Sequence, residues 1–332
     1  AMNWLADDNE LGPFSSLANK LSASYALSAD VDMSGNPNLK PIGSLVSPFK
    51  GRFDGKGFAI TNVAMNYPGL DGIALFRATD NAHIANVKIT QSTFNGNSKV
   101  AALIGNCQNS TVDNCSVNVS ISATSNAGGL IGCATSSAIA NSSAKGSLTS
   151  SGNNAGGLIG YVNTCTITGS HADVAVSGIG SYHGGFIGYQ LGTTTITNCY
   201  ARGSVTSTGS FVAGFMGFIR NATLNYCYSS GDSADFDFSG DVFKSAATFN
   251  SCVFRANASA GPANEGKGAF NNCIEVADVS ELQVIDNFPS WDFGPTTEEN
   301  TGYFWSMSSG LPTYGSSEEE PPSAAEFTVI FR

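Results

Sequence analysis

The sequence predicts an all-β protein folded as a right-handed parallel β-helix (a β-solenoid), with about 28 residues per coil and capped ends. Three observations support this prediction: a composition that disfavours helices, a Gly-bracketed apolar phrase that recurs at a fixed interval, and a second apolar phrase with the same interval. Only 12% of the 332 residues are charged and 38 are glycine, so helix-stabilising ion pairs are scarce and helix-breaking residues are common. The right hand follows from the crossover rule for parallel strands.

The Gly-bracketed phrase reads ALIG, GLIG, GLIG, GFIG and GFMG. Its second residue recurs at steps of 27, 28, 28 and 29 residues, at Leu103, Leu130, Leu158, Phe186 and Phe215. A fixed period between about 20 and 50 residues is typical of a solenoid, in which each period is one supersecondary unit. We extend the series by one coil in each direction, to Leu75 and Val242.

The second phrase is an apolar residue followed by x-Asn and then Cys, Ser or Val. It begins at Ile60, Ile84, Val112, Ile139 and Ile196, with weaker copies at Ile167, Leu224, Phe249 and Phe270. A third apolar column lies nine residues after this phrase, at Ile121, Leu148, Val176 and Val205. We therefore predict three short strands per coil, each paired with its equivalent one coil on, about 4.8 Å away. Eight or nine such coils are expected between residues 53 and 275, roughly one per repeat.

The ends of the chain break the period. Residues 14–21 form a short amphipathic helical pattern, and we assign residues 1–50 to an N-terminal cap and lead-in. The β-helix is assigned to residues 51–275, a C-terminal cap with two of the three tryptophans to 276–315, and an acidic linker or tail to 316–332. The tail ends in a strand-like apolar pattern, so we expect the natural protein to continue beyond Arg332.

These repeats resemble those of the GLUG-motif proteins, which are bacterial surface and secreted proteins. GLIG at 129 and at 157 matches the motif letter for letter, and residues 27–63 are similar to the lead-in of such proteins. The resemblance covers about residues 20–315; it departs from the motif at Ala102 and Ala213, and the motif is lost after residue 217. It implies an extracellular or cell-surface location, an adhesin-like role, or a place beside the catalytic domain of a secreted peptidase such as an immunoglobulin A peptidase.

Charge and motif context exclude several classes of function. The net charge of −11 and the absence of a basic run argue against nucleic acid and anionic membrane surfaces as partners. No apolar run reaches the length of about 18 residues that spans a bilayer, so we expect no membrane insertion. No helical pattern follows the Gly-rich phrases, as a nucleotide-binding loop would require, so we assign these glycines to bends and close packing and expect no cofactor.

The eight cysteines and the acidic residues have structural interpretations. Five cysteines share one position of the repeat and are expected to form a column of buried thiols: Cys115, Cys199, Cys227, Cys252 and Cys273. Cys107, Cys133 and Cys165 lie off this column, and a disulfide among them stays open. We expect no metal site, since zinc-like spacing is absent. Asp232, Asp235, Asp237 and Asp241 are assigned to a solvated loop, with calcium binding as the alternative.

One column of charged residues provides a test of the predicted pairing between successive coils. Lys145, Asp173 and Arg202 follow the second phrase by six residues in three successive coils. We expect a ladder of alternating charge on the outer face, with a catalytic cluster as the sharper alternative. We expect no catalytic residues elsewhere.

The loops before the Gly-bracketed phrases are the candidate binding edge. Two of them present aromatic or histidine side chains, and we name Tyr182, His183 and Phe211 as candidate binding residues. Rows of small polar groups with occasional aromatics suit a host glycan or an extracellular protein. A flat threonine array of the ice-binding kind is not expected, because Thr does not recur at one position for more than two coils in the predicted alignment.

We conclude that the chain is a non-enzymatic, adhesin-like binding or stalk module, monomeric or stacked end to end. Two alternatives stay open. One is a carbohydrate-active β-helix enzyme (a polysaccharide lyase or hydrolase), which needs clustered acidic and basic residues in a groove. The other is the non-catalytic region of a secreted peptidase.

Overall fold

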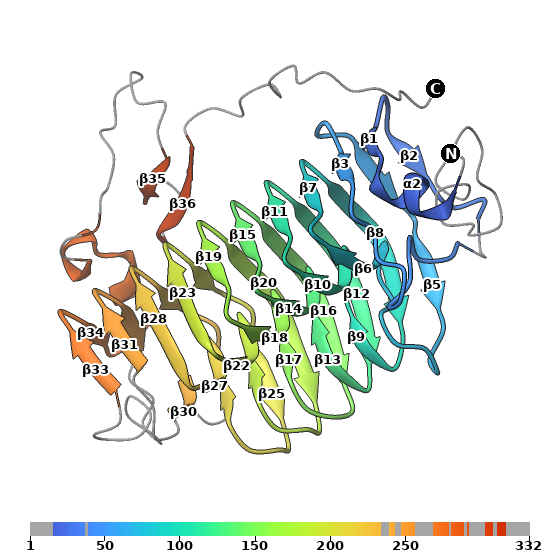
Figure 1. Cartoon of the computed structure of the whole chain (residues 1–332). Coiled ribbons are helices and arrows are strands. Elements are labelled where there is room, and N and C mark those ends of the chain that lie inside the picture. The colour runs from blue at the N-terminus through green and yellow to red at the C-terminus, as the bar shows by residue number, and fades with distance from the viewer. Residues whose placement is uncertain are drawn as a thin grey trace.

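The computed structural model describes residues 16–36, 39–233, 239–242, 247–255, 268–278, 280–288, 291, 303–307 and 311–316. The chain winds into a stack of coils in which three parallel sheets run along the stack and a fourth, shorter parallel sheet lies in the middle coils (Figure 1). The described residues contain one α-helix, α2 (Leu17–Ser22), and two 3₁₀ turns, η1 (Glu281–Gln283) and η2 (Ile285–Asn287). The predicted all-β solenoid of about 28 residues per coil is therefore confirmed.

The ten-stranded sheet contains the second sequence phrase. Its strands, in spatial order, are β1 (Ser24–Ala26), β3 (Arg52–Asp54), β7 (His83–Ala85), β11 (Thr111–Asp113), β15 (Ala138–Ala140), β19 (Thr166–Thr168), β23 (Thr193–Thr197), β28 (Asn221–Asn225), β31 (Ala247–Asn250) and β33 (Gly268–Asn271). Each apolar anchor pairs with its equivalent in the next coil, as in Val112 with Ile139. The position ahead of Ile84 is occupied by Phe53, whereas Ile60 pairs with Ile89 in another sheet. The assignment of Ile60 to this column was therefore wrong.

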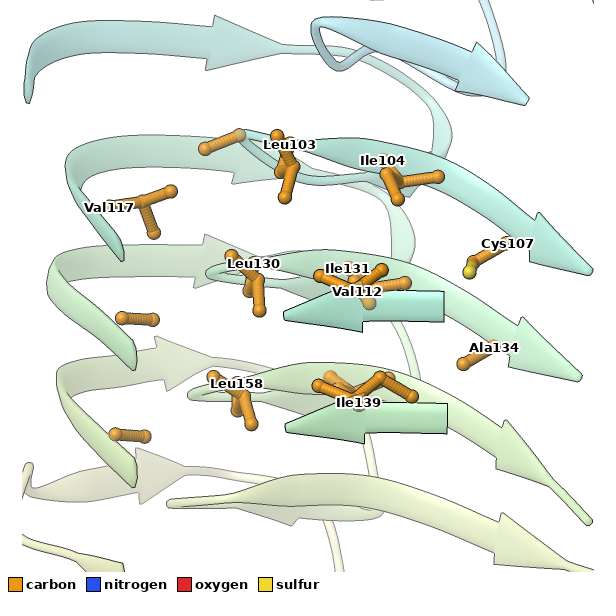
Figure 2. Close-up of a cluster of buried hydrophobic side chains, with 14 of the residues drawn as sticks. Leu103, Ile104, Cys107, Val112, Val117, Leu130, Ile131, Ala134, Ile139 and Leu158 are labelled. Carbon is orange, nitrogen blue, oxygen red and sulfur yellow. The ribbon is translucent and has the colours of Figure 1, made fainter. Parts of the chain in front are cut away.

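The seven-stranded sheet begins at the Gly-bracketed phrase. Its strands are β6 (Phe76–Asp80), β10 (Ile104–Gln108), β14 (Ile131–Thr135), β18 (Ile159–Asn163), β22 (Ile187–Leu191), β27 (Met216–Ile219) and β30 (Ser239–Val242). Leu103, Leu130 and Leu158 lie one above another just before these strands, and Ile104 and Ile131 lie beside them in the core (Figure 2). Val242 pairs with Ile219 and is therefore four residues out of step with Phe215, which corrects the predicted downstream position.

The twelve-stranded sheet contains the third apolar column. Its strands are β2 (Val31–Asp32), β4 (Ala59–Thr61), β5 (Ala64–Asn66), β8 (Lys88–Asn95), β12 (Ser116–Ala123), β16 (Ser143–Ser150), β20 (His171–Gly178), β24 (Tyr200–Ala201), β25 (Val205–Ser207), β29 (Tyr228–Ser229), β32 (Val253–Arg255) and β34 (Ile274–Val276). Ile121, Leu148, Val176 and Val205 pair in succession, as predicted.

A fourth, five-stranded sheet was not predicted. Its strands are β9 (Ser98–Val100), β13 (Ser125–Gly128), β17 (Ala155–Gly156), β21 (His183–Gly184) and β26 (Val212–Ala213). The middle coils therefore have four strands each rather than three. These strands are short, and they occupy the end of the stretches that sequence patterns assign to loops.

Glycine allows close backbone approaches at the first residue of the two GLIG phrases and of GFIG, and at the last residue of all five phrases. A Cβ on Gly157 would lie 2.0 Å from the carbonyl oxygen of Gly185 in the next coil. A Cβ on Gly217, the last residue of its phrase, would lie 2.6 Å from the carbonyl carbon of Tyr182 in the preceding coil. At Gly157 and Gly217 a side chain would collide with the backbone of a neighbouring coil, which explains glycine at these two positions.

The predicted helix at the N-terminal side is confirmed as α2, and Ser16 caps it by accepting a hydrogen bond from the backbone N–H of Asn19 at 3.2 Å. The parallel stacking begins inside the predicted lead-in, because β1 pairs with β3 and β2 pairs with β4. Residues 24–32 therefore already belong to the coils rather than to a cap that ends at residue 50.

The described part of residues 276–315 packs on the side of the stack. It contains η1, η2 and an antiparallel hairpin of β35 (Tyr303–Ser306) and β36 (Thr313–Ser316). Trp291 and Trp305 join a second buried cluster with Tyr200 and Tyr228 of the twelve-stranded sheet. Arg202 fixes this segment by donating hydrogen bonds to the carbonyl oxygens of Leu311 and Pro312, at 3.2 and 2.8 Å. The segment therefore covers the flank of several coils, whereas the sequence suggested a cap on the end.

Candidate binding surface

A corner of the coil presents the side chains that form the candidate site. In each coil one residue just before or within a strand of the five-stranded sheet has a left-handed backbone, with φ of 48° to 66° at Lys99, Asn126, Asn154, Tyr182 and Phe211. Asn adopts this conformation readily, but it is rare for bulky side chains. Tyr182 and Phe211 each have φ of 64°, so the local backbone is strained by about 1–3 kcal/mol per residue.

The corner column changes character along the stack. The Asn154 amide donates a hydrogen bond to Asn126 Oδ1 at 2.9 Å, and the Asn126 amide donates to Ser98 Oγ at 3.0 Å. In the next two coils aromatic rings replace this ladder, and Tyr182 and Phe211 stack with 5.3 Å between ring centroids and 2° between planes. The fold alone is satisfied by Asn at this corner, so the aromatic residues need another explanation.

A second column of rings stands beside the first. Tyr161 in β18, Tyr189 in β22 and Phe218 in β27 are in register and stack with ring-centroid distances of 5.9 and 4.3 Å. The Tyr182 ring meets the Tyr189 and Phe218 rings edge-on, at 5.2 and 5.6 Å. These contacts join the two columns into one surface over three successive coils, β18, β22 and β27 (Figure 1). We call it the aromatic patch: Tyr161, Tyr182, Tyr189, Phe211 and Phe218.

The aromatic patch is partly open to solvent. Phe218 is the most buried member at 7% exposure, and the other four rings are partly exposed. Burial raises the pKa of Tyr161, so its phenol stays protonated at neutral pH and can act as a hydrogen-bond donor. The surface therefore combines apolar ring area with hydroxyl groups.

The sequence identified only two members of the aromatic patch. Tyr182 and Phe211 were named as candidates, whereas Tyr161, Tyr189 and Phe218 were missed. The missed residues directly follow the Gly-bracketed phrase, in GLIGY, GFIGY and GFMGF. The repeated aromatic at that position was the available signal, and the strand register brings it beside the corner column.

His183 does not contribute an exposed side chain. It lies in β21, is 0% exposed, and pairs with Ala155 and Val212 in a column of small apolar residues. Its Nε2 lies 3.0 Å from the Gly152 carbonyl oxygen, and burial lowers its pKa. The expectation that His183 faces a ligand from the loop edge is wrong, because the residue after the corner points inward.

Uncharged polar groups surround the aromatic patch. Ser181 Oγ accepts a hydrogen bond from the Ser210 backbone N–H at 3.1 Å, next to the two corner rings. Asn163 and Leu191 pair in register two residues beyond the Tyr161 and Tyr189 rings. Arg220, two residues beyond Phe218, is exposed and is the cationic group at the edge of this surface. The environment is thus amide, hydroxyl and aromatic in character.

The predicted charged column is in register but does not form an ion-pair ladder. Lys145 pairs with Asp173, and the Arg202 backbone N–H donates to the Ala172 carbonyl oxygen at 2.9 Å. The Arg202 side chain turns to Tyr228 and to the C-terminal segment instead. Within the described ranges the ion pairs are Lys50–Asp80 at 3.3 Å and Lys56–Asp54 at 4.0 Å, so the expected ladder of ion pairs was wrong.

Threonine forms a longer column than the sequence alignment indicated. Thr166, Thr195, Thr223 and Thr248 pair in succession over four coils of the ten-stranded sheet. The expectation that Thr recurs over no more than two coils was therefore wrong. The coils between these residues differ in length, so counting a constant period misses the column.

The cysteine column is confirmed as buried thiols. All eight cysteines are free, and Cys273 is the partly exposed one. Cys115 donates through Sγ to the Asp113 carbonyl oxygen at 3.3 Å, and Ser142, at the same position one coil on, donates through Oγ to Ala140 at 2.6 Å. Cysteine and serine therefore fill the same place in the repeat, and each bonds to the carbonyl two residues earlier.

In the part of the chain that the structure describes, there is neither a cluster of metal-binding side chains nor a helix that could span a membrane. There, no group of three or more His, Cys, Asp or Glu side chains is close enough to share a metal ion. Asp235, Asp237 and the side chain of Asp241, which form the alternative calcium cluster with Asp232, lie outside the described residues. Within those same limits no helix is long and apolar enough to cross a bilayer.

Comparison with known proteins gives a family motif and a fold. The model of the GLUG motif matches residues 123–149 and 180–206, each of which spans about one coil. No curated protein matches the chain. A crystal structure from Bacteroides ovatus, described as "a putative immunoglobulin A1 protease", is similar over 89% of this chain and 86% of that chain, with 18% identity and a TM-score of 0.55. At this identity the likeness shows a shared fold.

Proposed function

Since this chain is a GLUG-repeat protein built as a parallel β-helix, we propose that it is a non-enzymatic, adhesin-like binding module of a secreted or cell-surface protein. The observation that supports binding is the aromatic patch, in which two aromatic residues occupy a strained corner that the two preceding coils fill with asparagine. Strained backbone at an exposed aromatic surface is typical of a site selected for contact. The rigid coil stack holds the patch in one geometry.

The location outside the cell rests on the GLUG repeats, which resemble those of surface and secreted proteins. A GLUG-repeat segment also fits the non-catalytic region of a peptidase, and the structural similarity to the Bacteroides ovatus protein favours keeping this second candidate. The enzyme alternative has less support, because the side chain of Arg202, which follows Asp173 in the charged column, is bonded to the C-terminal segment.

A binding panel tests the proposed function. The purified chain is applied to immobilised mucins, extracellular-matrix proteins and glycans, and the same polysaccharides are assayed for hydrolysis and β-elimination. We expect retention on at least one surface and no bond cleavage. Cleavage of a polysaccharide would support the enzyme alternative in place of the proposal. Absence of binding to all of the surfaces would refute the binding role.

A further inference from the structure

We propose that the aromatic patch docks a short, neutral oligosaccharide whose pyranose rings lie against the Tyr182 and Phe211 corner; this proposal rests on the binding role proposed above. The corner column supplies the first argument. Asn126 and Asn154 show that an amide satisfies this left-handed corner with a side-chain ladder. Two aromatic residues there replace this amide ladder at a backbone conformation that is costly for bulky side chains, and their rings stay partly exposed to solvent, which favours a contact outside the fold.

The rings are held before any ligand arrives. Tyr182 stacks on Phe211 and meets the Tyr189 and Phe218 rings edge-on, so four rings restrain one another. The last glycine of the family motif supports this arrangement, because Gly217 leaves room for the Tyr182 backbone to approach. Restrained aromatic side chains lose little conformational entropy on binding, which favours a weakly contacting ligand such as a sugar.

The size of the aromatic patch favours a small ligand over a folded protein. It spans three coils, roughly 10 Å between the outer two at strand spacing. Its rings are partly buried, so the exposed ring area is far below the roughly 800 Å² that each partner contributes to a stable protein interface. A short oligosaccharide matches these dimensions, because successive pyranose units advance by about the distance between coils.

The chemistry of the patch selects a neutral sugar. A pyranose presents axial C–H groups on one face and hydroxyl groups around its rim. The rings are stacked within each column, so the partly exposed ring area contacts the apolar face of the sugar, and the Tyr hydroxyls, Asn154, Asn163 and Ser181 match the rim. The chain has a net charge of −11, which repels sialylated or sulfated glycans, and Arg220 is the one cationic side chain among the named rim residues.

The test uses substitutions that the repeat itself supplies. In a Tyr182→Asn/Phe211→Asn variant both corners carry the residue found in the two preceding coils, so the far-UV circular dichroism should be unchanged. The matched control is Tyr226→Asn, which makes the same change at a left-handed corner of φ 54° elsewhere on the coil, beside Trp291. If the double variant does not fold, Tyr189→Asn replaces it, because Asn106 occupies the same column two coils before Tyr161.

The three proteins are compared on an array of neutral, sialylated and sulfated glycans and by calorimetric titration of the best neutral oligosaccharide. We expect the wild type to prefer neutral glycans, the double variant to bind at least about 10-fold more weakly, and the control to stay within about 2-fold. Preference for anionic glycans, equal loss in the control, unchanged binding in the double variant, or no neutral glycan bound would each overturn the inference. Retention on a host protein with no glycan binding would refute this inference while the broader binding role stands.

Discussion

Replacement of Gly157 by alanine is expected to separate two coils. A Cβ on Gly157 would lie 2.0 Å from the Gly185 carbonyl oxygen, whereas ordinary contact begins at 3.4 Å. The backbone must therefore move by about 1.4 Å, the difference between these two distances. The contact is with backbone, so no side-chain rotation can relieve it.

The magnitude follows from what that movement breaks. Gly157 donates through its N–H to Gly184 and accepts through its carbonyl oxygen from Gly129, both at 3.0 Å. Stretching these bonds costs about 1–3 kcal/mol, and local overpacking adds a further 1–3 kcal/mol. The lower chain entropy of the unfolded alanine variant offsets about 0.4–1 kcal/mol. We expect the free energy of unfolding to fall by about 3 kcal/mol.

Urea unfolding of Gly157→Ala is followed by far-UV circular dichroism and by tryptophan fluorescence. Two probes are needed because solenoids can lose cooperativity between coils. The matched control is Gly69→Ala, where a Cβ meets no atom within 4 Å; its free energy of unfolding should stay within about 0.5 kcal/mol of the wild type. A Gly157→Ala variant as stable as the wild type, or a control equally destabilised, would show that coil contact does not explain the glycine.

Three further predictions follow from the buried groups. In the native protein a thiol reagent should react first at Cys273, the partly exposed cysteine, and with the other seven only on unfolding; faster labelling of another cysteine would contradict the buried column. Burial lowers the pKa of His171 from 6.5 to about 4, so the unfolded state takes up the proton first and stability should fall as the pH drops from about 6.5 towards 4. His171→Tyr keeps a ring stacked on Tyr200 and removes the titrating imidazole. It should abolish at most about 3 kcal/mol of this loss of stability, and less than that because the His171 ring is partly exposed. Equal pH dependence of stability in variant and wild type would refute the assignment of this loss to His171. Arg202→Ala removes three hydrogen bonds and should accelerate amide exchange in residues 303–307 and 311–316 while the coils stay protected; unchanged exchange would show that Arg202 does not fix this segment.

Much of the fold could be predicted because a repeated column reports both the period and the direction of a side chain. Leu130 and Leu158 fall one coil apart, and their burial confirms the interior that their spacing indicated. The prediction failed where coil length changes. Phe53 and Ile84 are separated by a longer coil, so the phrase at Ile60, which has the same letters, was placed in the wrong sheet.

The site was predicted only in part because its members are distant in sequence and short strands give weak signals. Tyr182 and Tyr189 come from opposite sides of one Gly-bracketed phrase, and only the turn of the coil between them brings their rings to 5.2 Å. The strands of the five-stranded sheet, such as β17 (Ala155–Gly156), contain residues that do not favour strands. The burial of His183 follows from strand alternation, which could be applied only once β21 was known to be a strand.

The position of the C-terminal segment on the flank of the coils determines how a pulling force would enter the molecule. Tension applied from the side of residue 316 reaches the coils through Pro312, Arg202 and Tyr228, at strands β24 and β29. The load therefore enters the coils at β24 and β29 as well as at the last coils, β31 to β34, which lie beyond this attachment along the stack (Figure 1). The attachment would be loaded in shear across several side-chain contacts, and the terminal coils would be spared from being peeled off one strand at a time.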